Sequence, residues 1–275
     1  MTFGLSLFVV IAQDFPTYLK AHAIKLDRQD SLSNEVYNLI WDYQLIMVGE
    51  MHGTNEPAKF VIGLAELLAK EGDSVQVGLE IPPDQMTKYL KKRNNKSIYS
   101  SGFFALPAND GRASFAWAEL ISRLTKNPRV KIFFYDRDNY ESLKISDRDS
   151  IMYIKIKKQM QKHPAWKTVT LSGNVHNMLL PFRGENKMGF YLSEDSELNL
   201  TDKICSLNHA YGKGTGMGRR DNRLELAELD NSYSEYSTAV DYENYFFLFP
   251  VNVEFSYTGI YYTRSVTASM PVSSK

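Results

Sequence analysis

The chain has 275 residues, with 32 Lys and Arg against 32 Asp and Glu, so its formal net charge is zero. No block of like charge stands out, which argues against a nucleic-acid groove or an acidic tail. The single cysteine, Cys205, excludes an internal disulfide and a cysteine-based zinc site.

The first apolar stretch runs from Leu5 to Ala12 and ends near a small residue, as a signal peptide does. No basic segment precedes it, and it is far too short to span a bilayer, so no transmembrane span is expected. Two interpretations stay open. Residues 1–13 are either the remnant of a truncated signal peptide, which predicts an exported (periplasmic or secreted) protein, or a buried first strand or helix, which predicts a cytoplasmic one.

Four short runs of apolar residues are expected to form the core strands. They are rich in β-branched or aromatic residues and show little alternation, a pattern typical of strands buried on both faces of a parallel sheet. The four runs are 43–49, 75–81, 130–136 and 167–173.

Helical patterns separate these strands. The first has apolar residues at helical spacing and ends at a glycine, the second begins with prolines in its first turn, and the last two end before a proline, as helices often do. The segments are 55–72, 82–93, 113–128 and 146–164. This alternation of strands and helices predicts an α/β fold, with a mainly parallel central sheet and helices on both faces.

The second half of the chain is less regular. We expect further strands at 185–193 and 202–210, a flexible glycine-rich loop at 211–222 that borders the cleft, and closing strands at 245–253 and 258–268. The glycines of the loop do not match a phosphate-binding pattern. There is no internal repeat and no clear linker, so residues 1–275 are predicted to form a single α/β domain.

Polar side chains stand at the end of each core strand. In open parallel sheets, ligands bind beyond the carboxyl ends of the strands. In chain order these side chains are Glu50 and His52, then Glu80, then Asp136, and finally Asn174 and His176. Because parallel strand ends meet at one edge of a sheet, the sequence predicts one cleft lined by these groups.

The pairing of histidines with carboxylates indicates two kinds of chemistry. Histidine titrates near neutral pH and a carboxylate can orient it, which suits general acid–base catalysis. Two histidines and two glutamates also suit a divalent transition metal. The alternative is structural: Glu50 caps the next helix and His52 is a packed core residue. His209 is a further candidate to approach the same cleft, with a structural role as the alternative.

The motifs together resemble those of the erythromycin esterase/ChaN/TIKI superfamily. Gly-Glu-x-His-Gly stands at 49–53, a glutamate ends the second strand, Gly-Asn-x-His stands at 173–176, and Arg-Asp-x-x-Met stands at 148–152. The resemblance covers about residues 43–180, the part of the chain that bears the motifs.

The resemblance implies different activities in different members of that superfamily. Esterase-like members hydrolyse a macrolide lactone with a histidine base and no metal. By that analogy His52 activates water, Glu50 and Glu80 orient it or tune its pKa, and Arg148 and His176 stabilise the oxyanion. TIKI-like members are metal-dependent proteases, which would make Glu50, His52 and His176 ligands of a divalent transition metal. ChaN-like members bind haem and serve iron uptake.

The leading prediction is hydrolysis of an ester or amide bond by water activated at His52, with carboxylate or metal assistance. The substrate would be a small molecule or a peptide, contacted by Asn174, Asp136 and His209. The alternative is haem or iron binding without catalysis. No Gly-x-Ser-x-Gly elbow occurs, which argues against a serine hydrolase. No feature of the sequence indicates an oligomeric state.

Overall fold

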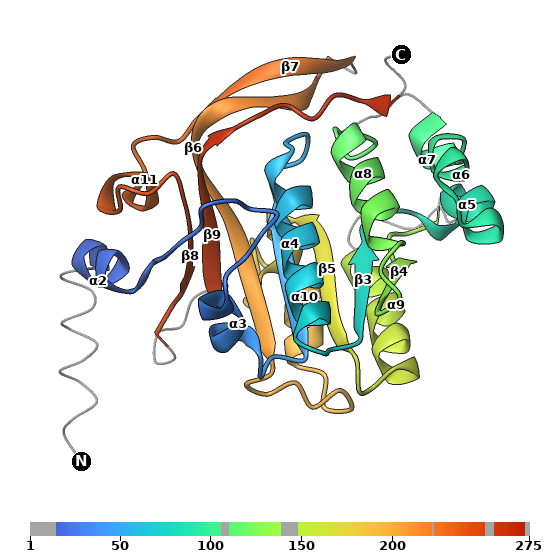
Figure 1. Ribbon diagram of the computed structural model, residues 1–275, viewed down its shortest axis with the longest axis horizontal. Coiled ribbons are helices and arrows are strands. Elements are labelled where there is room, and N and C mark those ends of the chain that lie inside the picture. Colours follow the sequence, from blue (N-terminus) through green and yellow to red (C-terminus); the bar gives the residue numbers. More distant parts are fainter. Residues whose placement is uncertain (1–14, 106–109, 139–147, 222, 251–255, 273–275) are drawn as a thin grey trace.

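The computed structural model describes residues 15–105, 110–138, 148–221, 223–250 and 256–272, so the interpretations of residues 1–13 lie outside the described part. One nine-stranded sheet runs through the described residues (Figure 1). Its strands are β1 (Ile24–Lys25), β2 (Leu45–Glu50), β3 (Val75–Leu79), β4 (Val130–Phe134), β5 (Lys167–Gly173), β6 (Ile204–Arg220), β7 (Arg223–Asp230), β8 (Asn244–Leu248) and β9 (Gly259–Val266). The four predicted core strands are confirmed as β2, β3, β4 and β5.

The sheet is mixed. Its strand order is β1-β8-β9-β6-β2-β5-β3-β4, and β7 pairs with β6 outside this order. The strands from β9 to β4 are parallel to one another, whereas the pairs β1–β8, β8–β9 and β6–β7 are antiparallel. The α/β prediction is confirmed, but the predicted "mainly parallel" sheet is a mixed one, and that description fits only the section from β9 to the edge strand β4. The pairing of β6 with β7 is antiparallel because only two residues separate the two strands in the sequence, whereas a parallel return needs a long crossover.

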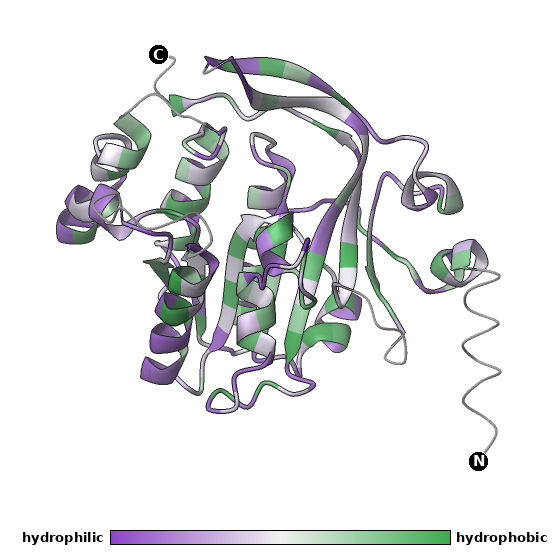
Figure 2. Cartoon of the chain, turned by 180° about the vertical axis from the view of Figure 1, so that it is seen from behind, coloured by the Kyte–Doolittle hydropathy of each residue, from purple (hydrophilic) through white to green (hydrophobic). Residues whose placement is uncertain are grey.

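Helices cover both faces of the sheet (Figures 1 and 2). They are α2 (Phe15–His22), α3 (Asn34–Ile40), α4 (Glu56–Lys70), α5 (Thr87–Lys92), α6 (Asn95–Tyr99), α7 (Gly102–Ala105), α8 (Phe115–Leu124), α9 (Arg148–Lys162), α10 (Met188–Ser193) and α11 (Glu235–Ala239), with single 3-10 turns η1 (Pro83–Met86) and η3 (Asn174–Asn177). No helix of the described segments is long and apolar enough to cross a membrane.

The apolar run in β2 shows why the central strands carry little alternation. Ile46 and Val48 pack in the cluster that contains α4 and α8, whereas Leu45 and Met47 pack in the cluster that contains α9 and α10. Successive residues of a strand point to opposite faces of the sheet. Since both faces are covered by helices, every position of this run must be apolar.

The prediction of a strand at 185–193 is wrong. Met188–Ser193 form the helix α10, in which Met188 and Leu192 are fully buried and pack in the α9 cluster. Residues four apart share one face of a helix. Burial of that face against α9 decided the conformation of this short segment.

The prediction of a flexible loop at 211–222 is also wrong, because β6 continues through most of that segment to Arg220. Gly214 has a φ of +141°, and a Cβ there would lie 1.9 Å from the main-chain oxygen of Val266. The main-chain N–H of Met217 donates to the oxygen of Gly53 at 3.0 Å, and a Cβ on Gly53 would overlap the Met217 backbone. These glycines let backbones approach closely, so they mark tight packing and not mobility.

The other strands of the second half agree better with the prediction. The strand predicted at 202–210 is confirmed from residue 204, where β6 begins, and β8 and β9 lie where the closing strands are expected. Residues 251–253 of the first closing segment lie outside the described part of the chain.

Candidate functional site

The end of β2 brings Glu50 and His52 into direct contact. Glu50 follows Ile46 and Val48 at even spacing, so its side chain points to the same face, which α4 and α8 cover. There Trp117 of α8 donates its indole N–H to Oε2 of Glu50 at 3.1 Å. Oε1 of Glu50 lies 2.5 Å from Nδ1 of His52. The Nδ1–H of the ring therefore donates to the carboxylate, which leaves the lone pair on Nε2 for water or a substrate.

The surroundings of His52 favour its charged form. Burial by itself lowers the pKa of the imidazole, but the negative charges of Glu50 and Glu80 raise it, and Arg112 partly opposes them. The net result is a pKa above the ordinary value of 6.5. His52 is 30% exposed whereas Glu50 is fully buried, so the ring stands at the surface on a buried carboxylate.

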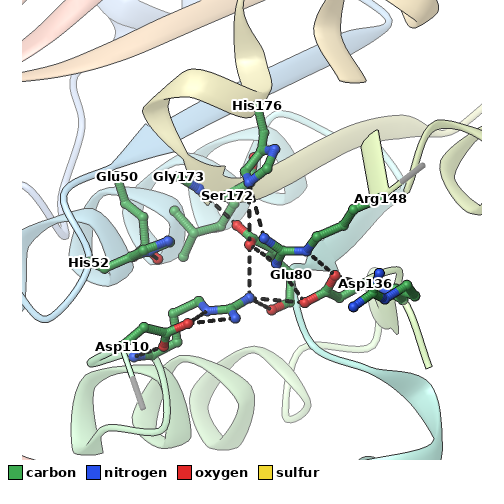
Figure 3. Close-up of polar contacts among 12 residues, drawn as sticks. Glu50, His52, Glu80, Asp110, Asp136, Arg148, Ser172, Gly173 and His176 are labelled. Carbon is green, nitrogen blue, oxygen red and sulfur yellow. Dashed lines mark hydrogen bonds and ion pairs between the residues drawn. The ribbon is translucent and has the colours of Figure 1, made fainter. Parts of the chain in front are cut away.

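Glu80, directly after β3, holds two arginines together. Nη1 of Arg112 donates to Oε1 of Glu80 at 2.8 Å, and Nη2 of Arg148 donates to the same oxygen (Figure 3). The main-chain N–H of Gly173 donates to Oε2 at 2.8 Å. Burial alone would raise the pKa of this carboxyl, but the positive charges around it, Arg112 first, hold the pKa well below its usual range. Glu80 is therefore an ionised anchor of the cluster.

Asp136, two residues after the end of β4, is shared by the same two arginines. Nε and Nη2 of Arg148 bind its two oxygens at 2.8 Å each, a bidentate arrangement, and Nη1 of Arg112 reaches Oδ2 at 3.1 Å. Burial opposes ionisation of Asp136, but Arg148 outweighs it and lowers the pKa. Asp110 holds Arg112 from the other side, with Oδ2 2.8 Å from Nε. The network fixes both guanidinium groups in place.

His176, in η3 after β5, forms a second histidine–carboxylate pair. Its Nδ1 lies 2.7 Å from Oδ1 of Asp149, and Nη1 of Arg148 donates to its Nε2 at 3.3 Å. Asp149 also accepts the main-chain N–H of Met188 at 2.9 Å. The two neighbours at the start of α9, Arg148 and Asp149, thus hold both ring nitrogens.

Gly173 lies between the two histidines. It is the register partner of Glu50 in the β2–β5 ladder. A Cβ at this position would be 3.1 Å from Nε2 of His52 and 3.6 Å from Cδ2 of His176. The His52 ring therefore lies close against the glycine, and a side chain at this position would crowd it.

Asn174 and His209, predicted to contact a substrate, are linked to each other behind the strand ends. The carboxamide of Asn174 accepts the N–H of His209 at 2.8 Å and donates to its main-chain oxygen at 3.2 Å. His209 is 2% exposed, and burial lowers its pKa to about 3, so the ring is neutral. Its Nδ1 accepts the N–H of Met51 at 3.4 Å. His209 does not reach the surface on which a substrate would bind, and it supports the chain near Glu50 instead.

Comparison with known proteins fits this architecture. No protein-family model matches the sequence, and neither does any curated protein. Among the similar solved structures, three are covered over 95% or more of their length. A protein from Bacillus cereus has a TM-score of 0.73 at 13% identity, covering 94% of this chain and 98% of that one. A succinoglycan biosynthesis protein has a TM-score of 0.72 at 9% identity, with the same two coverages.

The third structure is a mutant of the erythromycin esterase EreC in its open conformation. It has a TM-score of 0.62 at 12% identity, and the match covers 87% of this chain and 95% of that one. This chain has the erythromycin esterase fold. The predicted resemblance to the erythromycin esterase/ChaN/TIKI superfamily is thereby confirmed in the fold. At identities of 12% and 13% the similarity concerns the fold alone.

Within the erythromycin esterase fold, the site uses four residues that sequence reasoning missed, namely Asp110, Arg112, Trp117 and Asp149. Arg112 follows no core strand, and Trp117 reads as an ordinary core residue of a helix, so neither carries a local signal. Asp149 does carry a local signal, because it stands beside Arg148 in the Arg-Asp-x-x-Met element at 148–152. Its position one residue after a predicted site arginine was the signal that could have found it.

The buried hydrogen bond from Trp117 gives a testable stability effect. Trp117→Phe is expected to lower the free energy of unfolding by about 1–3 kcal/mol, because it leaves Oε2 of the buried Glu50 without its donor. Urea denaturation measures the change. Trp41→Phe is the matched control, since that ring is 57% exposed, and its effect should stay within about 0.5 kcal/mol. Equal effects of the two substitutions would contradict the role of the indole N–H.

The residues do not fit the metal-dependent alternative as the structure places them. Across the described segments, no group of three or more His, Cys, Asp and Glu side chains is arranged to hold a metal ion. Oε1 of Glu50 and Nδ1 of His52 face each other, and Nε2 of His176 faces the guanidinium of Arg148. A metal ion bound to this set would have to displace a fixed positive charge.

The same residues also fit haem poorly. The groups around both histidines are carboxylates and guanidinium groups held in a charged network. A haem face needs apolar contacts as well as an axial ligand. Haem binding stays a prediction that the donor set does not favour.

Proposed function

We propose that this protein is a hydrolase of ester or amide bonds in which His52 is the general base, assisted by carboxylates and without a metal. The observation that carries the proposal is the Glu50–His52 pair. A buried carboxylate lies 2.5 Å from Nδ1 of a ring that is 30% exposed, and the opposite nitrogen, Nε2, faces Gly173, which has no side chain. A carboxylate that orients a histidine in this way is the arrangement expected of a general base.

In the proposed reaction, water hydrogen-bonded to Nε2 of His52 attacks the carbonyl carbon and gives its proton to the ring. The buried charge of Glu50 stabilises the imidazolium that forms. The positive charge of Arg148, whose Nη1 is held by His176, stabilises the negative charge on the carbonyl oxygen. When the tetrahedral intermediate collapses, the carbon–oxygen or carbon–nitrogen bond breaks and His52 returns the proton to the leaving group.

In the proposed reaction, the charged network holds the guanidinium group of Arg148 in a fixed position. Glu80 and Asp136 hold Arg148 through its Nε and Nη2 atoms, so Nη1 keeps a constant direction toward His176. Donors that are already oriented need no reorganisation when charge develops in the transition state. The similarity in fold to an erythromycin esterase supports macrocyclic lactones and simple esters as the first substrates to try.

The proposal is tested by assaying erythromycin, nitrophenyl esters of increasing chain length and a set of peptide amides, with and without a chelator. We expect turnover that the chelator leaves unchanged. We also expect kcat/KM to rise with pH and to level off only above 6.5, because His52 must be neutral to accept a proton and its pKa is raised. Turnover lost on chelation would favour the metal-dependent alternative. A stoichiometric haem complex with a Soret band and no turnover of any substrate would contradict the proposal.

A further inference from the structure

A column of stacked rings lies behind the Glu50–His52 pair. It consists of Phe60 from α4, Tyr261 from β9 and His209 from β6. The ring centroids of Phe60 and Tyr261 are 4.2 Å apart with planes inclined by 12°, and those of Tyr261 and His209 are 4.7 Å apart with planes inclined by 7°. Phe60 and Tyr261 are fully buried and His209 is 2% exposed. Such a stack leaves the phenol and the imidazole little freedom to move.

Both polar groups of the column bind the main chain on either side of Glu50. The hydroxyl of Tyr261 donates to the main-chain oxygen of Gly49 at 2.5 Å. Nδ1 of His209 accepts the main-chain N–H of Met51 at 3.4 Å, and its Nε2 lies 3.4 Å from Oγ1 of Thr263. The oxygen of Gly49 belongs to the peptide before Glu50 and the N–H of Met51 to the peptide after it. The column therefore holds both peptides that flank the Glu50 Cα.

The main chain needs these partners because β2 leaves β6 at this point. The ladder between the two strands ends at the pair Val48 and Leu207. Beyond it, the carboxamide of Asn174 occupies the N–H and the oxygen of His209. A Cβ on Gly49 would lie 2.2 Å from Oδ1 of Asn174, so only glycine fits there. Buried peptide groups that lose a strand partner must find another one, and Tyr261 supplies it for Gly49.

We propose that Tyr261, supported by His209, is a positioning residue that sets the direction of the Glu50 carboxylate and thereby of His52. Tyr261 touches neither His52 nor a substrate. It acts through the Gly49–Glu50 peptide, from which the Glu50 side chain extends to Trp117 and His52. The expected effect of Tyr261 on turnover rests on the proposed hydrolysis, whereas its effect on the position of Glu50 and His52 does not.

The experiment compares Tyr261→Phe with Tyr262→Phe. Tyr262 is the matched control, because it is 1% exposed, stands next in the same strand and donates its hydroxyl to Ser237 at 3.1 Å, within a separate cluster. The readout is the low-field NMR signal of the His52 Nδ1 proton, assigned by its absence in His52→Ala. We expect the signal to shift upfield or disappear in Tyr261→Phe and to stay unchanged in Tyr262→Phe.

Turnover gives a second readout of the same variants. Tyr261→Phe should reduce kcat about tenfold with KM unchanged, because misplacement of a base costs rate and not ground-state binding. Tyr262→Phe should leave both constants within error. His209→Phe, which keeps a flat ring in the stack but cannot accept from Met51, should act like Tyr261→Phe and replaces it if that variant does not fold.

The outcomes separate the two proposals. An unchanged proton signal in Tyr261→Phe, or an equal change in both tyrosine variants, would overturn the positioning role. If wild-type protein hydrolyses nothing in the panel but the signal still depends on Tyr261 alone, the positioning stands and the hydrolase proposal fails. If the proton signal is the same in Tyr261→Phe and wild type while His52→Ala abolishes turnover, the hydrolase proposal stands and the positioning role of Tyr261 fails.

Discussion

His52→Ala is expected to reduce kcat for ester or amide hydrolysis by about 10²- to 10⁴-fold, the range that a positioned general base contributes. The pair with Glu50 is the reason: the carboxylate holds Nδ1 at 2.5 Å, so the base acts through Nε2, and alanine removes both nitrogens. The variant should keep its fold, because the ring is 30% exposed and belongs to no hydrophobic cluster. Steady-state kinetics measure the loss, and circular dichroism confirms the fold.

Two further variants make this test specific. His22→Ala is the matched control, since His22 is exposed at the end of α2 and bonds only to the main-chain oxygen of Tyr18 among the described hydrogen bonds. It should leave kcat unchanged. Glu50→Gln keeps the shape of the side chain but removes the charge that stabilises the imidazolium, and it should lose part of the rate. If His52→Ala and His22→Ala are equally active, His52 is not the base.

Glu80→Ala is expected to lower the free energy of unfolding by about 3–5 kcal/mol, the cost of removing one partner from a buried charge pair. Glu80 is fully buried and receives hydrogen bonds from Arg112, Arg148 and the main chain of Gly173. Its loss leaves the two guanidinium groups sharing Asp136, with Asp110 as a further carboxylate partner of Arg112 alone. Urea denaturation at neutral pH measures this difference.

The control for Glu80 is Glu197→Ala. That carboxylate is 69% exposed and bonds to Lys157, so its removal should cost less than about 1 kcal/mol. Glu80→Gln separates charge from volume, because it fills the same space without the charge. A loss with alanine but none with glutamine would mean that a cavity, and not the charge, is responsible.

The variant Glu80→Gln also tests how the stability that Glu80 contributes depends on pH. The folded-state pKa of Glu80 is depressed, so its ionisation stabilises the folded state at every pH above the ordinary value of 4.5. This contribution is lost as the pH falls from there toward the folded-state pKa. The difference in stability between wild type and Glu80→Gln should therefore be constant from neutral pH to about 5 and shrink below 4.5. A difference that grows on acidification would contradict an ionised Glu80.

Much of the central fold could be predicted from local pattern. The strand Lys167–Gly173 was predicted with its observed bounds, and the helices Glu56–Lys70 and Arg148–Lys162 lie within the predicted segments. Periodicity works there because burial on two faces, or on one helical face, imposes a regular spacing on the residues themselves. Where the pattern was short or rich in glycine, as at 185–193 and 211–222, packing against distant segments decided the conformation, and prediction failed.

In the candidate site too, some features could be predicted from local pattern and others depend on packing. The residues that end the core strands, from Glu50 to His176, could be found because a parallel sheet brings its strand ends to one edge. Contact between Glu50 and His52 follows from their separation of two residues. The position of each residue at a strand end and the contact between Glu50 and His52 depend on residues close in the sequence, so the sequence by itself determined them.

Tertiary structure alone decided which groups hold those residues. Trp117, Arg112 and Tyr261 reach Glu50, Glu80 and the oxygen of Gly49 from elements 32 to 212 residues away. No local spacing encodes such contacts, because each depends on how helices and strands pack around a buried carboxylate or peptide. A buried polar group needs a partner wherever the fold can supply one, and only the folded chain shows which residue that is.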